Sequence, residues 1–150
     1  MGYVEGNTIV NNRVFLIPNA DLFMFGILNS NVHNAWMRKV AVRLKDDYSY
    51  SKDLVYNTFP MPEFTEEQKK NIAQTAQLIL DARAKYPDCS LADLYDEVAM
   101  PSELRRAHQL NDKAVMAAYG WKAGHEAFQS EVGCVAELMK MYQRIVGNRE

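Results

Sequence analysis

A basic segment followed by hydroxyl side chains carries the clearest chemistry in this chain. Four cations lie within eight residues, with no acidic residue among them: Arg38, Lys39, Arg43 and Lys45. Hydroxyl groups and a further cation follow: Ser49, Tyr50, Ser51 and Lys52. Cations beside hydroxyl groups are the side chains that contact the phosphates of a nucleic-acid backbone. We therefore expect phosphate contacts from one set of residues: Arg38, Lys39, Arg43, Ser49, Tyr50, Ser51 and Lys52. The alternatives are a solvated basic helix surface, and tyrosines that only anchor the loop on the core.

Lys45 and Asp47 form a Lys-x-Asp pair within the same segment. Lysine donates to the O6 and N7 acceptors of guanine in the major groove, and aspartate accepts from the N4 amine of cytosine. The pair is therefore chemically suited to reading a G·C base pair. The alternative is a solvated turn in which the two side chains pair weakly with each other.

The distribution of charge is more informative than the net charge of −2. Residues 31–45 carry four basic and no acidic side chains, whereas residues 60–150 carry eleven basic and fourteen acidic ones. A basic stripe on an otherwise acidic chain is typical of a surface that faces DNA.

The first half of the chain predicts a small β element and one long helix. Residues 8–10 and 14–17 are β-prone and are separated by Asn11-Asn12, which predicts two paired strands. Asp21 caps a predicted helix over residues 22–44, where Phe25 and Trp36 belong to a buried face. Weak helix formers at Gly26 and residues 29–31 favour a break there. Residues 46–53 predict a loop, and residues 54–59 predict a short strand.

The second half predicts a helical bundle. Thr65-x-x-Gln68 is a capping box that opens a helix reaching about Tyr86. Further helices are expected from Ser90 through Val98, from Pro101 to Gly120, and over residues 126–146. The predicted fold is α+β and mainly α: a small β element with one long helix, followed by a bundle of about four helices.

Several ordered strings resemble one protein family. They are Phe25-Gly26-Ile27-Leu28-Asn29-Ser30, Arg43-Leu44-Lys45-x-Asp47-Tyr48-x-Tyr50-Ser51, Val55-Tyr56-Asn57-x-Phe59-Pro60-x-Pro62, and Ala107-His108-x-x-Asn111-Asp112. The chain resembles the end of the target-recognition domain and the helical C-terminal domain of MmeI-like proteins. These are class I S-adenosylmethionine-dependent DNA methyltransferases, some of them fused restriction-modification enzymes. The resemblance implies that residues 1–62 belong to the recognition domain and residues 63–150 to the C-terminal domain.

The resemblance also implies roles and partners. In MmeI-like proteins the two variable positions after Arg-Leu, here Lys45 and Asp47, help to set the recognised base. The whole protein would bind S-adenosylmethionine and methylate adenine N6 in double-stranded DNA, using an upstream methyltransferase domain that this chain lacks. The chain has neither a glycine-rich cofactor turn nor an Asn-Pro-Pro-Tyr motif. We therefore expect a C-terminal fragment that recognises DNA, holds no cofactor or metal, and is not an enzyme by itself.

A different class of function stays open. The fragment is then a structural module that braces the methyltransferase domain or a subunit interface, with little DNA contact of its own. The absence of an apolar run long enough for a membrane span predicts a cytoplasmic protein with no membrane partner, and an apolar face left exposed favours homo-oligomers. Cys89 and Cys134 lie far apart in sequence, which predicts reduced, buried thiols.

Overall fold

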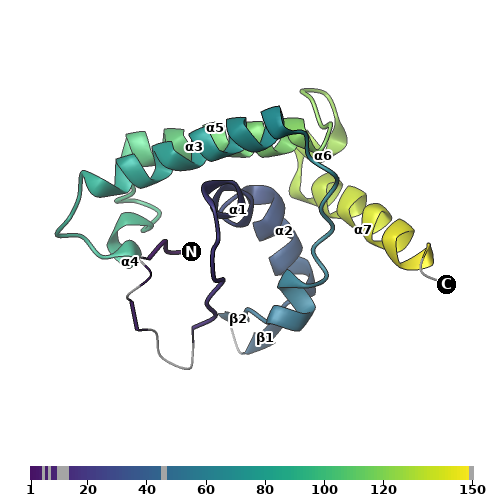
Figure 1. Cartoon of the computed structure of the whole chain (residues 1–150), viewed down its shortest axis with the longest axis horizontal. Coiled ribbons are helices and arrows are strands. Elements are labelled where there is room, and N and C mark those ends of the chain that lie inside the picture. The colour runs from purple at the N-terminus through teal and green to yellow at the C-terminus, as the bar shows by residue number, and fades with distance from the viewer. Residues whose placement is uncertain (5, 7, 10–13, 45–46, 149–150) are drawn as a thin grey trace. The chain divides into compact units, whose positions relative to one another are not determined.

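The computed structural model describes residues 1–4, 6, 8–9, 14–44 and 47–148, apart from the side chains of residues 44 and 47. The chain forms two compact units. Unit 1 comprises Met1–Ser30 and Thr65–Val115, and unit 2 comprises Asn31–Phe64 and Met116–Glu150. Each unit thus combines an early and a late segment of the chain. Figure 1 labels the helices and strands and colours the chain by residue number.

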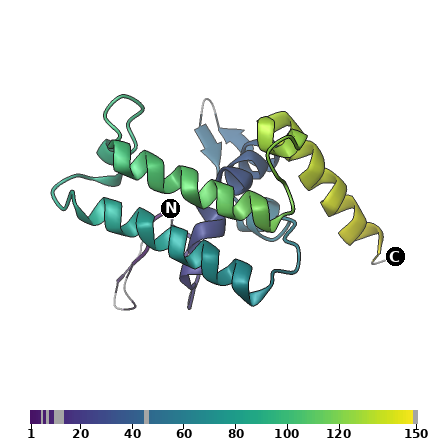
Figure 2. The same ribbon diagram turned by 90° about the horizontal axis from the view of Figure 1, so that it is seen from above.

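Unit 1 is helical. It contains α1 (Leu22–Leu28), α3 (Glu66–Ala84), α4 (Leu91–Leu94) and most of α5 (Ser102–Ala118). Helices α3 and α5 lie side by side (Figure 2). Its core draws on all four helices: Phe25, Ala76, Ile79, Ala82, Leu94, Leu104 and Ala107.

A buried asparagine ties three of these helices together. The Asn111 amide of α5 donates to the carbonyl of Gly26 in α1 at 2.8 Å, and its oxygen accepts from the Thr75 hydroxyl of α3 at 3.1 Å. A Cβ at Gly26 would lie 2.7 Å from Ile72 and 2.9 Å from the Asn111 oxygen. Glycine is therefore required for α1 to approach its neighbours so closely.

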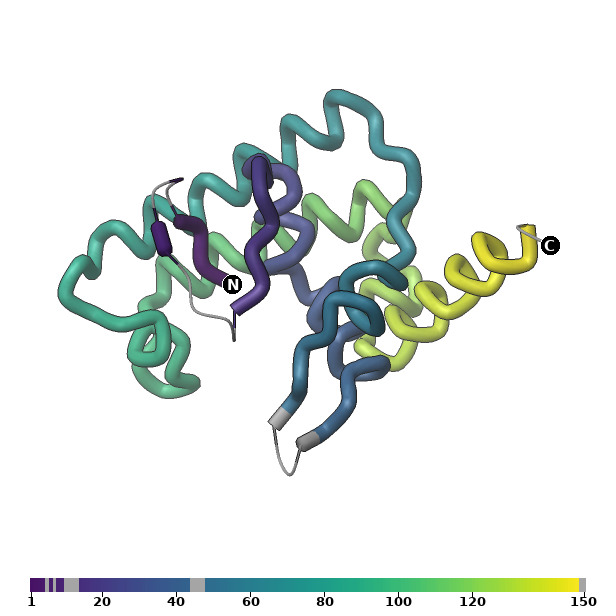
Figure 3. Tube along the Cα trace, turned by 60° about the horizontal axis from the view of Figure 1, so that its bottom comes forward, coloured from purple at the N-terminus to yellow at the C-terminus, as the bar shows by residue number. Residues whose placement is uncertain are grey.

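Unit 2 holds the basic segment. Its early part contains α2 (Asn31–Val40), β1 (Val42–Leu44), β2 (Asp47–Ser49) and the π-helix η1 (Lys52–Tyr56). The strands are antiparallel, with Arg43 opposite Tyr48, and Figure 3 follows this backbone from α2 to η1. Its late part contains the end of α5, α6 (Glu126–Gln129) and α7 (Glu131–Gly147). A Cβ at Gly133 would lie 2.3 Å from the Glu126 carbonyl oxygen, so glycine permits α6 and α7 to pack closely.

The mainly helical fold class with a small β element is confirmed, and so are several helix starts. Thr65 and Gln68 form the predicted capping box, and Ser90 caps α4. Gly120, just beyond α5, adopts φ +80°, a conformation that glycine accommodates without strain.

Other predictions about local structure were wrong. Thr8, Ile9 and residues 14–17 form no strand, while residues 10–13 lie outside the described part. The expected 22–44 helix ends at Val40, and residues 42–44 form β1 instead. The break that weak helix formers favour within it is confirmed at Asn29 and Ser30, whose side chains donate to the α1 carbonyls of Phe25 and Ile27.

The next elements differ as well. The expected 46–53 loop contains β2, and the expected 54–59 strand is replaced by η1, whose first turn Ser51 caps. The helix after Ser90 ends at Leu94, and the last helix is split at Ser130, which caps α7.

Candidate nucleic-acid interface

Helix α2 is anchored in unit 2 by a buried tryptophan. Trp36 is 1% exposed, and its indole nitrogen donates to the Thr58 hydroxyl at 3.2 Å. Its ring lies 5.8 Å from the ring of Tyr142 in α7. The prediction that Trp36 belongs to the core is confirmed. This packing fixes which side of α2 faces inward, and therefore which side presents the basic residues.

His33 connects the same helix to the segment after β2. It is 1% exposed, lies 3.0 Å from the Tyr50 hydroxyl through Nε2, and packs edge-on against Phe59 at 4.6 Å. Burial lowers the pKa of His33 to about 4 and raises the pKa of Tyr50 to about 12. Both groups are therefore neutral near pH 7, and Tyr50 serves at least in part to anchor the chain.

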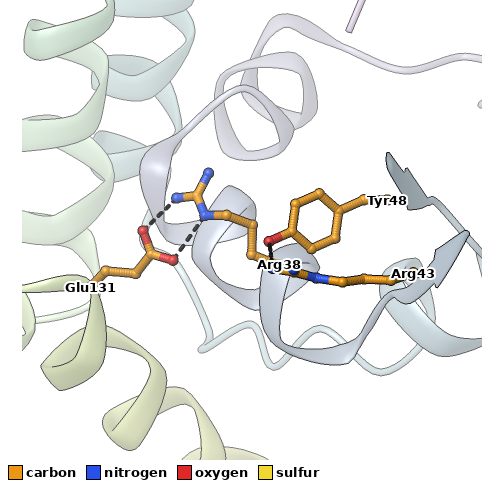
Figure 4. A network of polar contacts seen from close by, with 4 residues as sticks. All are labelled: Arg38, Arg43, Tyr48 and Glu131. Carbon is orange, nitrogen blue, oxygen red and sulfur yellow. Dashed lines mark hydrogen bonds and ion pairs between the residues drawn. The ribbon is translucent and has the colours of Figure 1, made fainter. Parts of the chain in front are cut away.

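Arg38 is held by a carboxylate distant in sequence. Its Nε and Nη2 donate to the two oxygens of Glu131, the first residue of α7, at 2.8 and 2.7 Å (Figure 4). The bonds to Arg38 lower the pKa of Glu131, and the same bonds raise the pKa of Arg38. Nη1 is not used by this bidentate pair, so Arg38 retains donors for a further oxygen.

Arg43 pairs with an aromatic ring across the two strands. Its guanidinium carbon lies 4.8 Å from the centre of the Tyr48 ring, and its Nη2 donates to the Tyr48 hydroxyl at 2.6 Å (Figure 4). The two residues are direct cross-strand partners. The pair therefore supports the register of β1 with β2 while leaving the other donors of Arg43 available.

Two lysines of the basic segment have similar, open surroundings. Lys39 in α2 and Lys52 in η1 are both exposed. Within the described residues, no ion pair holds either of them. Among the predicted phosphate-binding residues, Lys39 and Lys52 are thus exposed cations that no ion pair within the described part of the chain holds.

The remaining predicted site residues lie in or beside β2. Ser49 ends β2 and is half-buried, and Ser51 accepts from the Leu54 amide as the cap of η1. Asp47 is opposite Leu44 in the strand pair. Lys45 lies outside the described residues, between the two strands in sequence. Unit 2 therefore brings the predicted site residues that are described together on α2, on the strand pair and at the start of η1.

Comparisons with known proteins identify the family. Residues 1–63 match the family model for the MmeI target recognition domain, and residues 64–148 match that for the MmeI C-terminal domain. The chain belongs to the MmeI family. The boundary between the matched domains falls at residues 63 and 64, whereas each compact unit of the structure contains residues from both matched domains.

Two relatives of this MmeI-family chain are much longer proteins. DNA methyltransferase A of Bacillus subtilis (strain 168) is 39% identical over 145 residues, which are 97% of this chain and 16% of that protein. The type IIL restriction-modification enzyme MmeI, solved in complex with DNA, is 47% identical with a TM-score of 0.81. That similarity covers 87% of this chain and 17% of the MmeI chain. This chain thus spans less than a fifth of either relative.

Sequence reasoning did not find Glu131. It lies 93 residues from its partner Arg38 in an acidic half of the chain, and an isolated glutamate there gives no local signal. The cross-strand role of Tyr48 was missed as well, because the segment was predicted to be a loop. Cys89 is exposed rather than buried, whereas Cys134 is buried as expected.

Metal sites and membrane-spanning helices were the two other features considered for the described residues. No cluster of three or more potential metal ligands occurs among those residues. None of their helices is both long and apolar enough to cross a membrane.

Proposed function

We propose that this chain is the sequence-recognition part of a larger DNA methyltransferase or restriction-modification enzyme. The observation that supports this most strongly is that Lys39 and Lys52 are exposed and have no ion-pair partner among the described residues. Both lysines lie in the part of the chain that matches a target recognition domain. The relative MmeI was solved in complex with DNA. Double-stranded DNA is therefore the proposed partner.

The proposed contacts with DNA are of two kinds, to phosphates and to base edges. Lys39 and Lys52 bind phosphates directly, and Arg38 and Arg43 add contacts through the donors that their internal bonds leave over. Ser49, Tyr50 and Ser51 contribute hydroxyl groups near the same backbone. Lys45 and Asp47 read base edges, with lysine donating to guanine and aspartate accepting from cytosine.

The whole protein is proposed to methylate adenine N6 in DNA using S-adenosylmethionine, in the cytoplasm. This chain supplies no catalytic group. Residues 1–62 belong to its recognition domain and residues 63–150 to its C-terminal domain, and an upstream methyltransferase domain is the second partner. Purified chain is expected to transfer no tritiated methyl group to DNA, and measurable transfer would contradict the proposal.

The base-reading role is tested with a pool of duplexes that carry a randomised segment. Bound duplexes are separated and sequenced for the wild type, for Asp47→Asn and for Lys52→Ala. Asparagine pairs best with adenine, so D47N should replace a preference for cytosine by one for adenine at a single position. Lys52→Ala should weaken binding of all sequences equally. An unchanged preference in D47N would refute base reading by Asp47.

A bracing function is the second candidate, and the acidic excess of the helical half favours it for residues 65–150. Contacts within unit 2 show how the late segment packs on the early one. Tyr119, in the late segment, donates to the Pro60 carbonyl at 3.0 Å, and Tyr142 packs on Trp36. Double charge reversal at Lys39 and Arg43 separates the two functions. A DNA-binding chain loses affinity for all duplexes, whereas a bracing module keeps its affinity for a separately purified methyltransferase domain.

A further inference from the structure

Two pairs of side chains in unit 2 join α7 to α2 and β1 to β2. The two oxygens of the Glu131 carboxylate accept from Nε and Nη2 of Arg38 (Figure 4). The guanidinium of Arg43 lies over the Tyr48 ring and donates to the Tyr48 hydroxyl. The two pairs lie close together along the chain, because β1 begins at Val42, two residues after α2 ends at Val40. We call these four residues the Glu131 network.

The geometry of the Arg38 pair is that of an oriented contact. Two parallel bonds fix both the position and the plane of a guanidinium, unlike a single contact between charges. Glu131 is itself held in place, because it is the first residue of a helix that Ser130 caps. A carboxylate at this position is further stabilised by the helix dipole.

The network also joins the two matched domains. Arg38, Arg43 and Tyr48 lie in the part that matches the target recognition domain, and Glu131 lies in the part that matches the C-terminal domain. In sequence, the candidate base-reading residue Lys45 lies between the two strands, and Asp47 is the first residue of β2.

We propose that Glu131 is a positioning residue for DNA specificity, which acts through Arg38 to hold α2 and, with it, the strand pair that follows α2. This strand pair contains Asp47 and borders Lys45 in sequence. The proposal deepens the proposed function and rests on it for the role of Lys45 and Asp47. In this arrangement the C-terminal domain contributes directly to recognition. The main role of Arg38 is then to join α2 to Glu131 of α7, and its contact with phosphate is secondary.

The first test needs no DNA. Amide hydrogen exchange of the strand pair is measured by NMR for the wild type, for Glu131→Gln and for Glu137→Gln. Glu137 is the matched control, because it lies on the same helix, loses the same charge, and forms its ion pair with Lys140 of that helix. Loss of a partly exposed bidentate pair should accelerate exchange in β1 and β2 by about two- to fivefold. Equal exchange in E131Q and E137Q would overturn the proposal.

The second test reverses the pair. The double variant Arg38→Glu with Glu131→Arg should bring strand exchange back toward the wild-type rate, while either single reversal does not. Failure of the double variant to restore exchange would also overturn the proposal.

The same variants are then taken through the randomised-duplex selection. E131Q should reduce the base preference among the selected duplexes, while the salt-dependent binding through Lys39 is retained. E137Q should keep the wild-type base preference. A sharp preference in E131Q would contradict the positioning role. A wild-type chain without any preference would instead contradict base reading itself, and the exchange data would still decide whether Glu131 holds the strands.

Discussion

Replacing Asn111 by alanine should destabilise the protein more than any polar substitution at its surface. The side chain is fully buried and makes bonds of 2.8 and 3.1 Å to Gly26 and Thr75. Alanine would leave the Gly26 carbonyl without this donor in the core, which costs about 1–3 kcal/mol, and would remove the bond from Thr75, which contributes roughly 1 kcal/mol. Alanine also has the better helix propensity, which returns about 0.5 kcal/mol.

The expected loss for Asn111→Ala is therefore about 2–3 kcal/mol of unfolding free energy. Asn71→Ala is the matched control, because Asn71 is exposed on α3 and undergoes the same chemical change. Urea unfolding followed by far-UV circular dichroism measures both, and a loss of this size lowers the midpoint by about 1 M. Both tryptophans, Trp36 and Trp121, lie in unit 2, so fluorescence alone would follow the wrong unit. A difference below about 0.5 kcal/mol between the two variants would refute this account of the unit 1 core.

Three further predictions concern unit 2 and the thiols. Gly133→Ala should destabilise the fold by roughly 1–3 kcal/mol in urea unfolding, because its Cβ would lie 2.3 Å from the Glu126 carbonyl oxygen; an unchanged midpoint would contradict the close packing of α6 on α7. Stability should fall by about 3 kcal/mol as pH drops from 6.5 toward 4, since the unfolded chain protonates His33 first and burial lowers the folded pKa of His33 to about 4. His33→Gln should remove this part of the pH dependence in urea unfolding, whereas the part due to His108, whose pKa burial also lowers to about 4, should remain. Iodoacetamide should label the exposed Cys89 in the native protein and Cys134 only after unfolding, because burial raises the pKa of Cys134 to about 12; native labelling of both by mass spectrometry would contradict this.

Local signals in the sequence predicted much of the fold. The capping box at Thr65 and Gln68 and the glycine after α5 work through neighbouring backbone groups, so a single sequence reveals them. The burial of Trp36 followed from helical periodicity, because one face of α2 packs inward.

The missed features depend on contacts that are distant or on competition between local structures. Residues 54–59 have β-prone side chains, yet Ser51 caps η1 and the segment forms a π-helix. Weak helix formers favoured the break near residues 29–31, but the side-chain bonds from Asn29 and Ser30 to the α1 carbonyls that end α1 were not predicted. No local pattern shows that Arg38 pairs with Glu131, because only the packing of α2 beside α7 brings the two residues together.

The candidate site was thus predicted more fully in its composition than in its geometry. The basic residues and hydroxyl groups could be chosen from the chemistry of phosphate binding. The sequence could not show which of these cations bond to other side chains of the protein, because those bonds depend on Tyr48 across the strand pair and on Glu131 in α7. The structure therefore singles out Lys39 and Lys52 within a longer basic segment.

DNA binding by this chain is tested most directly by the salt dependence of fluorescence anisotropy on a mixed-sequence duplex. Lys39→Ala is compared with Lys70→Ala, which removes an exposed lysine from α3 in unit 1. We expect affinity that falls steeply with salt, and a slope that shrinks by about one in K39A but stays at the wild-type value in K70A. Absence of binding at low salt, or an equal loss of slope in both variants, would contradict a phosphate-binding surface at α2.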